Sequence, residues 1–138
     1  MKIDYSTDDN KCFVCGKENP KGLKLDFIYD KKSGITKTNV VFKEYMQGYE
    51  GIIHGGFISM LLDEVMAKAC LNAGYIAVTG RLNIKFIKPV SPGEDVSFYG
   101  KIDTVKGRAI KVLAWCEDKK SVKKAEAESV FIVLSRSM

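Results

Sequence analysis

The sequence predicts an α+β protein in which one long central helix is wrapped by a curved, mostly antiparallel β-sheet. Three observations lead to this class. Several segments alternate between apolar and polar residues with the period of a strand. One segment alone has the length and apolar content of a long helix. That helix is apolar on nearly every side, so it must be enclosed rather than laid on a surface.

The chain of 138 residues is most simply one domain with a single core, spanning residues 1–138. Two strands are expected first, at "LKLDFIYD" (23–30) and at the β-branched "ITKTNVVFK" (35–43). A glycine-punctuated loop, "EYMQGYEGIIHGG", then leads into the helix, which runs to about Asn72. Four longer strands, expected in a meander, follow at 75–90, 94–105, 109–118 and 123–135.

An N-terminal segment, residues 1–22, carries the pair Cys12 and Cys15 in "CFVCG". This spacing supplies half of a zinc site, but a closed structural site needs four ligands. No second CxxC and no nearby histidine provides the other half, although two chains could pool their pairs. We therefore expect a thiol-bearing turn and no metal, with all four cysteines of the chain reduced.

Charge and hydropathy narrow the expected cellular location of the protein and the classes of partner that it could bind. The net charge of +5 permits an anionic partner but identifies none, and no nucleic-acid-binding motif is present. No apolar run reaches the roughly 18 residues of a membrane span, and the polar start does not resemble a secretory signal. We expect a cytoplasmic protein with neither nucleic acid nor membrane as partner.

Two adjacent acids lie inside the otherwise apolar helix. Glu64 precedes Lys68 by four residues, the favourable order for a helix ion pair. Asp63 has no cation three or four residues away on either side, and a buried, unpaired carboxylate would cost several kcal/mol. Asp63 therefore faces either solvent or a partner's donors for structural reasons, or a site that uses it.

The helix begins with Gly55 and Gly56, where the first backbone N–H groups lack partners within the helix. Glycine lets a ligand approach these donors closely, and they can stabilise an oxyanion. With Asp63 about two turns further on, the arrangement suits acyl transfer, although a plain flexible helix start also explains the glycines. His54 is the single histidine, which excludes a His-clustered metal site within one chain. No GxSxG, GxGxxG or P-loop motif is present.

These segments resemble a known family. "HGGFISMLLDE" (54–64), followed by "TGRLNIKFIKPVSPGEDV" (79–96), resembles the hotdog-fold thioesterases of the PaaI-like group. "CFVCGKENPKGLKLDF" (12–27) is similar to one branch of that group. The resemblance implies a hotdog fold and hydrolysis of an acyl-coenzyme A without a cofactor. It also implies active sites at the interface of a homodimer, with two dimers commonly pairing into a tetramer.

The resemblance also implies residue roles. Asp63 matches the catalytic acid, acting as general base or as nucleophile. Gly55 matches the residue whose backbone N–H polarises the thioester carbonyl, with Gly56 beside it. His54, Gln47 and Thr79 are the expected substrate-binding residues. Thr79 aligns with a hydroxyl residue near the acid in some relatives, and is expected to hold the water. Gln47 is the one amide where some relatives carry an asparagine. Candidate cations for the coenzyme phosphates are Arg81, Lys85, Lys88 and Arg108.

The sequence leaves two other functions open. A hotdog protein can bind an acyl thioester without cleaving it, as a sensor or carrier. A hotdog dehydratase or hydratase uses a histidine with an acid across the interface, whereas His54 here lies in the glycine loop. The sequence discloses neither the acyl group nor the choice between dimer and tetramer.

Overall fold

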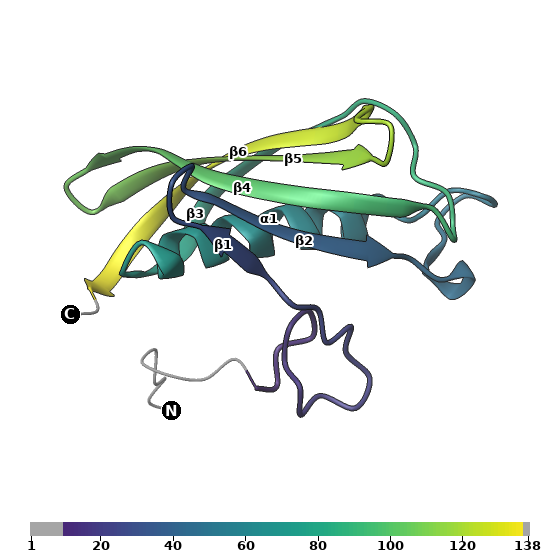
Figure 1. Cartoon of the computed structure of the whole chain (residues 1–138), viewed down its shortest axis with the longest axis horizontal. Helices are drawn as coiled ribbons and strands as arrows, with labels where there is room; N and C mark the ends of the chain where they lie inside the picture. The colour runs from purple at the N-terminus through teal and green to yellow at the C-terminus, as the bar shows by residue number, and fades with distance from the viewer. Residues whose placement is uncertain (1–9, 137–138) are drawn as a thin grey trace.

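The computed structural model describes residues 10–136, which form six strands, one long helix and one short 3-10 helix (Figure 1). Residues 1–9 and 137–138, which belong to the predicted domain of 1–138, lie outside the described range. The elements in chain order are β1 (Ile28–Asp30), β2 (Ile35–Val41), η1 (Glu44–Met46), α1 (Gly55–Asn72), β3 (Tyr75–Phe86), β4 (Asp95–Lys106), β5 (Ala109–Asp118) and β6 (Lys123–Arg136).

The six strands form one antiparallel sheet in the order β1-β2-β4-β5-β6-β3, which arches over α1 (Figure 1). This confirms the predicted hotdog architecture of a central helix wrapped by a sheet. The predicted meander of the last four strands is wrong, because only β4, β5 and β6 follow one another. β3 lies at the far edge beside β6 and runs parallel to β2. Parallel strands need a crossover connection, which α1 supplies beneath the sheet.

The first predicted strand is also wrong in extent, because 23–30 was expected and β1 covers only Ile28–Asp30. Upstream of β1 the chain bonds to the N-terminal loop instead of to β2. The Leu23 N–H donates to the Phe13 carbonyl at 2.7 Å and the Leu25 N–H to the Val14 carbonyl at 2.9 Å. Lys24 between them has φ 52°, outside the strand region. These contacts fasten the N-terminal loop to the body of the protein.

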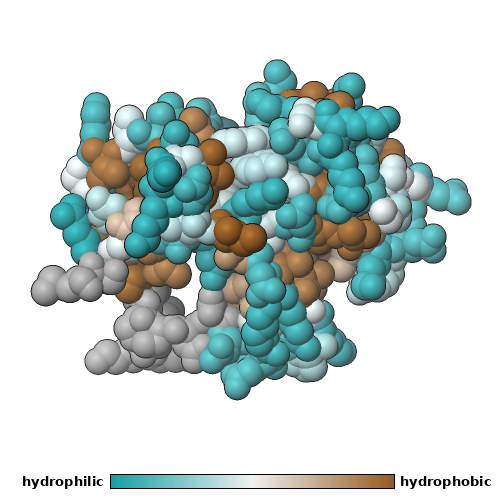
Figure 2. Space-filling view, viewed as in Figure 1, coloured by the Kyte–Doolittle hydropathy of each residue, from teal (hydrophilic) through white to brown (hydrophobic). Residues whose placement is uncertain are grey.

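Helix α1 supplies the centre of the core. Its buried residues, of which Leu61 and Leu62 are fully covered, face the concave side of the sheet, where they meet Phe98, Ile110 and Phe131. The outer surface is mostly hydrophilic on the face shown in Figure 2, with apolar areas between the polar side chains. Within the described residues, α1 does not combine the length and the apolar character that crossing a bilayer demands.

Gly100 of β4 sets how closely the sheet approaches the helix. A Cβ atom at this position would lie 2.6 Å from the Val65 carbonyl oxygen of α1, a contact with backbone that cannot rotate away. We expect Gly100→Ala to lower the free energy of unfolding by about 2 kcal/mol or more, since overpacking a core typically costs about 1–3 kcal/mol. Urea unfolding measures this. Gly55→Ala, whose Cβ would meet only the Phe86 ring at 3.4 Å, is the control. Equal midpoints for the two variants would contradict the expectation.

Candidate active site

The N-terminus of α1 is capped by the side chain of the residue before it. His54 is the N-cap, and its Nδ1 accepts a hydrogen bond of 2.8 Å from the Gly56 N–H. The His54 carbonyl accepts from the Phe57 N–H at 3.0 Å. The first backbone N–H groups of an α-helix have no acceptor in a preceding turn. Two of them, those of Gly56 and Phe57, are thus hydrogen-bonded to His54. His54 was expected to bind the substrate, and in this structure it caps the helix. The Gly56 N–H is occupied by its hydrogen bond to His54.

Gly55 is different, because its N–H donates to no acceptor within residues 10–136. The residue borders a groove of about 460 Å³, here called the Gly55 groove, whose walls include Tyr49, Ile52, Gly55, Ile58, Phe86 and Lys88. The walls are mainly apolar. The groove therefore lies beside a residue whose unengaged N–H is at the positive end of the helix dipole.

The Asp63 carboxylate lies two turns further along α1, on the side that faces β3. The Thr79 hydroxyl of β3 donates a hydrogen bond of 2.6 Å to its Oδ1. Asp63 is partly exposed, so the carboxylate is not sealed in the core. The structure therefore brings together the predicted acid and the predicted hydroxyl residue and leaves the second carboxylate oxygen, Oδ2, with remaining acceptor capacity.

A bulge in β3 directs Thr79 towards the helix. The pairing of β3 with β6 shifts between Thr79 and Arg81, so Gly80 is the extra residue. Before the bulge Tyr75 and Ala77 pack against the core, and after it Leu82 and Ile84 do so. Bulges change which side chains face inwards and are frequent beside active sites. In a strand that alternated strictly from residue 79 to residue 84, Thr79 would lie on the same side as Arg81, away from Asp63.

The amide of Gln47 is occupied within its own loop. Its Nε2 donates to the Glu44 carbonyl at 2.7 Å, and its Oε1 accepts from the Gly51 N–H. Gln47 also forms an isolated β-bridge with Ile53, directly before the helix cap. These bonds give Gln47 a role in shaping the loop that leads to His54. Contact between Gln47 and a substrate stays a prediction.

The four candidate cations lie in different surroundings. Lys88 borders the Gly55 groove, whereas Arg108 uses Nε and Nη2 to bond the Val133 carbonyl at 3.2 and 3.1 Å. Sequence reasoning did not single out Lys124, which also borders the groove and lies 3.3 Å from Glu94 and 3.9 Å from Asp118. No local motif marks this lysine, because its neighbours come from distant strands.

Gly55 and Asp63 do not meet within one chain. Eight residues separate them on one helix, and a rise of 1.5 Å per residue places them about 12 Å apart along its axis. A thioester carbonyl has to lie within about 3 Å of its oxyanion donor and close to the attacking water as well. One chain therefore presents the two halves of such a site at separate places.

Comparison with known proteins gives a consistent result. A family model described as "Thioesterase superfamily" matches residues 50–123. A bovine protein named acyl-coenzyme A thioesterase THEM4 is 28% identical over 91 residues, which cover 64% of this chain and 37% of that protein. The chain thus spans little more than a third of the length of this curated relative.

Solved structures share the fold at lower identity. A Streptococcus mutans protein bound to acetyl CoA superposes with a TM-score of 0.76 at 20% identity, covering 83% of this chain and 91% of that one. The Escherichia coli PaaI protein, from the phenylacetic acid degradation operon, superposes with a TM-score of 0.77 at 20% identity, covering 88% and 89%. At these identities the likeness concerns the fold.

Proposed function

Because the chain belongs to the thioesterase superfamily, as its motifs predicted, we propose that it hydrolyses an acyl-coenzyme A to a free acid and coenzyme A. The observation that carries this proposal is the Asp63 carboxylate held by the Thr79 hydroxyl at 2.6 Å. The bovine relative named as an acyl-coenzyme A thioesterase and the fold neighbour bound to acetyl CoA support the same class of substrate.

In the proposed reaction Asp63 acts as general base on a water molecule, which attacks the thioester carbonyl. The carbonyl oxygen gains negative charge as the tetrahedral intermediate forms. The intermediate then expels the coenzyme as its thiolate, which takes up the proton, so that one water is consumed and an acid and a thiol are produced. Direct attack by the carboxylate on the carbonyl is the alternative first step, and it would pass through an anhydride that water then hydrolyses.

The Gly55 N–H is the proposed donor to the developing oxyanion. Its position at the start of α1 adds the field of the helix to the hydrogen bond. The adjacent Gly56 N–H supports this role indirectly, since its bond to His54 Nδ1 fixes the first turn of the helix. The mainly apolar Gly55 groove offers space for part of the substrate beside this donor.

The 12 Å between Gly55 and Asp63 leads us to include a homodimer in the proposal. In the described residues β3 pairs only with β6, so its other edge is open along 12 residues. Val78 and Phe86 on this strand are 42% and 57% exposed, and a long apolar edge strand favours pairing with another chain. A second copy beside β3 would bring its own Gly55 towards Asp63. Light scattering measures the mass, which also tests the predicted pairing of two dimers.

Thr79→Val tests how the carboxylate is held. The substitution keeps a β-branched side chain but removes the hydroxyl that donates to Asp63. We expect kcat to fall about tenfold with little change in KM, in line with the loss of one hydrogen bond to a charged group of about 1.5 kcal/mol. Thr79→Ser, which retains a hydroxyl, should recover most of the rate. Equal rates for the Val and Ser variants would show that the hydroxyl does not act through Asp63.

The proposed function itself is tested by release of free thiol from a panel of short-chain, medium-chain and aromatic acyl-CoAs. Hydrolysis of at least one of them is expected, and the order of rates gives the acyl class. Tight binding of acyl-CoA without thiol release would overturn the proposal in favour of a binding protein. Release of water from, or its addition to, the acyl chain would identify a dehydratase or hydratase instead.

A further inference from the structure

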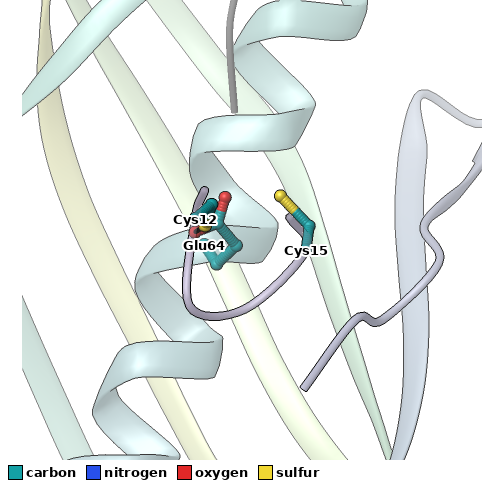
Figure 3. Close-up of side chains that lie close together, drawn as sticks. All are labelled: Cys12, Cys15 and Glu64. Atoms are coloured by element: carbon teal, nitrogen blue, oxygen red, sulfur yellow. Dashed lines mark hydrogen bonds between the residues drawn. The ribbon is translucent and has the colours of Figure 1, made fainter. Parts of the chain in front are cut away.

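The N-terminal loop and the middle of the helix bring three metal-binding side chains together. Cys12 and Cys15 lie on the loop in front of α1, and Glu64 reaches them from the helix, with the strands behind (Figure 3). One ligand atom from each residue lies within 4.8 Å of the other two. Cys12 and Glu64 are 52 positions apart in the sequence, so the CxxC spacing alone supplied only two of these ligands.

The spacing of these atoms fits a tetrahedral zinc ion. Zinc–sulfur and zinc–oxygen bonds of about 2.3 and 2.1 Å at a tetrahedral angle separate two sulfurs by about 3.8 Å and a sulfur from an oxygen by about 3.6 Å. The Cys12 Sγ lies 3.5 Å from Glu64 Oε2, close to the second of these values. A small movement of the three side chains towards one another would bring their ligand atoms to these distances.

The loop that holds the thiols is fixed before any ion binds. A Cβ atom on Gly16, directly after Cys15, would lie 2.3 Å from the Asn10 carbonyl oxygen and 2.5 Å from the Cys12 nitrogen, so only glycine fits. The Gly16 N–H donates to the Cys12 carbonyl at 2.9 Å. Val14, between the two cysteines, is 2% exposed and belongs to the core. A preformed loop reduces the entropy that is lost on binding.

We propose that Cys12, Cys15 and Glu64 bind one Zn²⁺ ion that joins the N-terminal loop to helix α1. Two thiolates favour zinc over magnesium or calcium, and the carboxylate disfavours copper(I). Within residues 10–136 no fourth cysteine, histidine or acid joins the group, so a water molecule completes the tetrahedron. Binding converts two thiols to thiolates and releases two protons. The site then carries a net charge of −1, with Lys68 one helical turn from Glu64.

The other two cysteines provide internal controls. Cys70 and Cys116 are buried in the core and lie outside the cluster. Burial raises the pKa of each thiol from 9.0 to about 12, so both remain protonated and poorly nucleophilic near neutral pH. In the folded protein without metal, an alkylating reagent should modify Cys12 first and spare these two. Zinc should slow the modification at Cys12 and leave the other two unchanged.

The direct test is the metal content of the full chain expressed with zinc in the medium and purified without chelator. About one zinc per chain is expected by mass spectrometry of the metal. Cys12→Ser, Cys15→Ser and Glu64→Gln should each weaken zinc binding at least tenfold, because even loss of an outer-shell partner typically costs about 10–100-fold. Cys70→Ala and Glu128→Gln, which change a thiol and an exposed carboxylate elsewhere, should retain the metal.

Circular dichroism of each variant separates loss of the site from loss of the fold. If a variant at Cys12, Cys15 or Glu64 does not fold, alkylation of the wild-type protein with and without added zinc still shows whether zinc binds at Cys12. The proposal is overturned if the wild-type chain holds no zinc and added Zn²⁺ fails to protect Cys12. It is also overturned if Glu64→Gln binds zinc as tightly as wild type. Asp63→Asn should keep its zinc, so failure of this proposal and failure of the proposed hydrolysis are distinguishable.

Discussion

Replacing Asp63 by asparagine is expected to lower the rate of thioester hydrolysis by about 10²–10⁴-fold, the range that a positioned general base contributes. Asparagine has nearly the shape of aspartate, and its carbonyl oxygen can still accept the 2.6 Å hydrogen bond from Thr79. The fold, the oligomer and acyl-CoA binding should therefore persist. The loss should appear in kcat, because the amide cannot take a proton from water.

The measurement is free thiol release from the best substrate of the panel, with Asp103→Asn as control. Asp103 is an exposed aspartate on β4, 3.9 Å from Lys111, and its substitution makes the same chemical change away from the site. Equal losses in the two variants would point to a general effect of charge. Full activity of Asp63→Asn would show that another group performs the chemistry.

Replacing Gly55 by proline is the second change with a large expected effect. Proline lacks an N–H group but is favoured at the first position of a helix, so α1 should still form. His54 has φ −56° and ψ 132°, a conformation suited to the residue before proline. We expect hydrolysis to fall by about 10²–10³-fold, the cost of removing one oxyanion donor.

Gly55→Ala is the matched control, because it keeps the N–H group and adds a Cβ atom in the same place, 3.4 Å from the Phe86 ring. If the backbone donor is what matters, the alanine variant retains most of the rate and the proline variant does not. Similar losses in both would attribute the effect to crowding of the Gly55 groove. An active proline variant would exclude the Gly55 N–H as the oxyanion donor.

The two inactive variants together test whether each site is shared between chains. In a heterodimer of Asp63→Asn and Gly55→Pro, one site combines both defects, and the other combines an intact Asp63 with an intact Gly55 from the second chain. Random exchange of subunits makes half of the dimers mixed, so about a quarter of the wild-type rate should return. No recovery after verified exchange would place both groups of each site in one chain.

Local sequence patterns predicted a large part of the fold. The apolar stretch after His54 gave a helix to about Asn72, and the alternating segment 109–118 coincides with β5 (Ala109–Asp118). These elements follow from periodicity, since the spacing of apolar residues within a segment shows whether one side or most sides of the strand or helix are buried. The same glycines and acid that stood out in the sequence also led to the family, which the family model confirms.

Patterns failed where pairing between distant segments overrides local preference. Residues 23–27 alternate like a strand, yet Leu23 and Leu25 bond to the N-terminal loop. The order of strands departs from a meander because α1 carries the chain from β2 to the opposite edge of the sheet. Neither outcome depends on a property of the residues within the segment itself.

The sequence by itself determined most of the elements and the family, and it singled out Asp63 as the candidate acid, because motif and periodicity are local. Only the tertiary structure decided what each group touches. The bulge at Gly80 turns Thr79 towards Asp63, His54 takes the Gly56 donor and leaves that of Gly55 open, and Glu64 joins Cys12 across 52 positions. Each of these contacts depends on strand register or loop packing, which arises only when segments distant in the chain pack against one another.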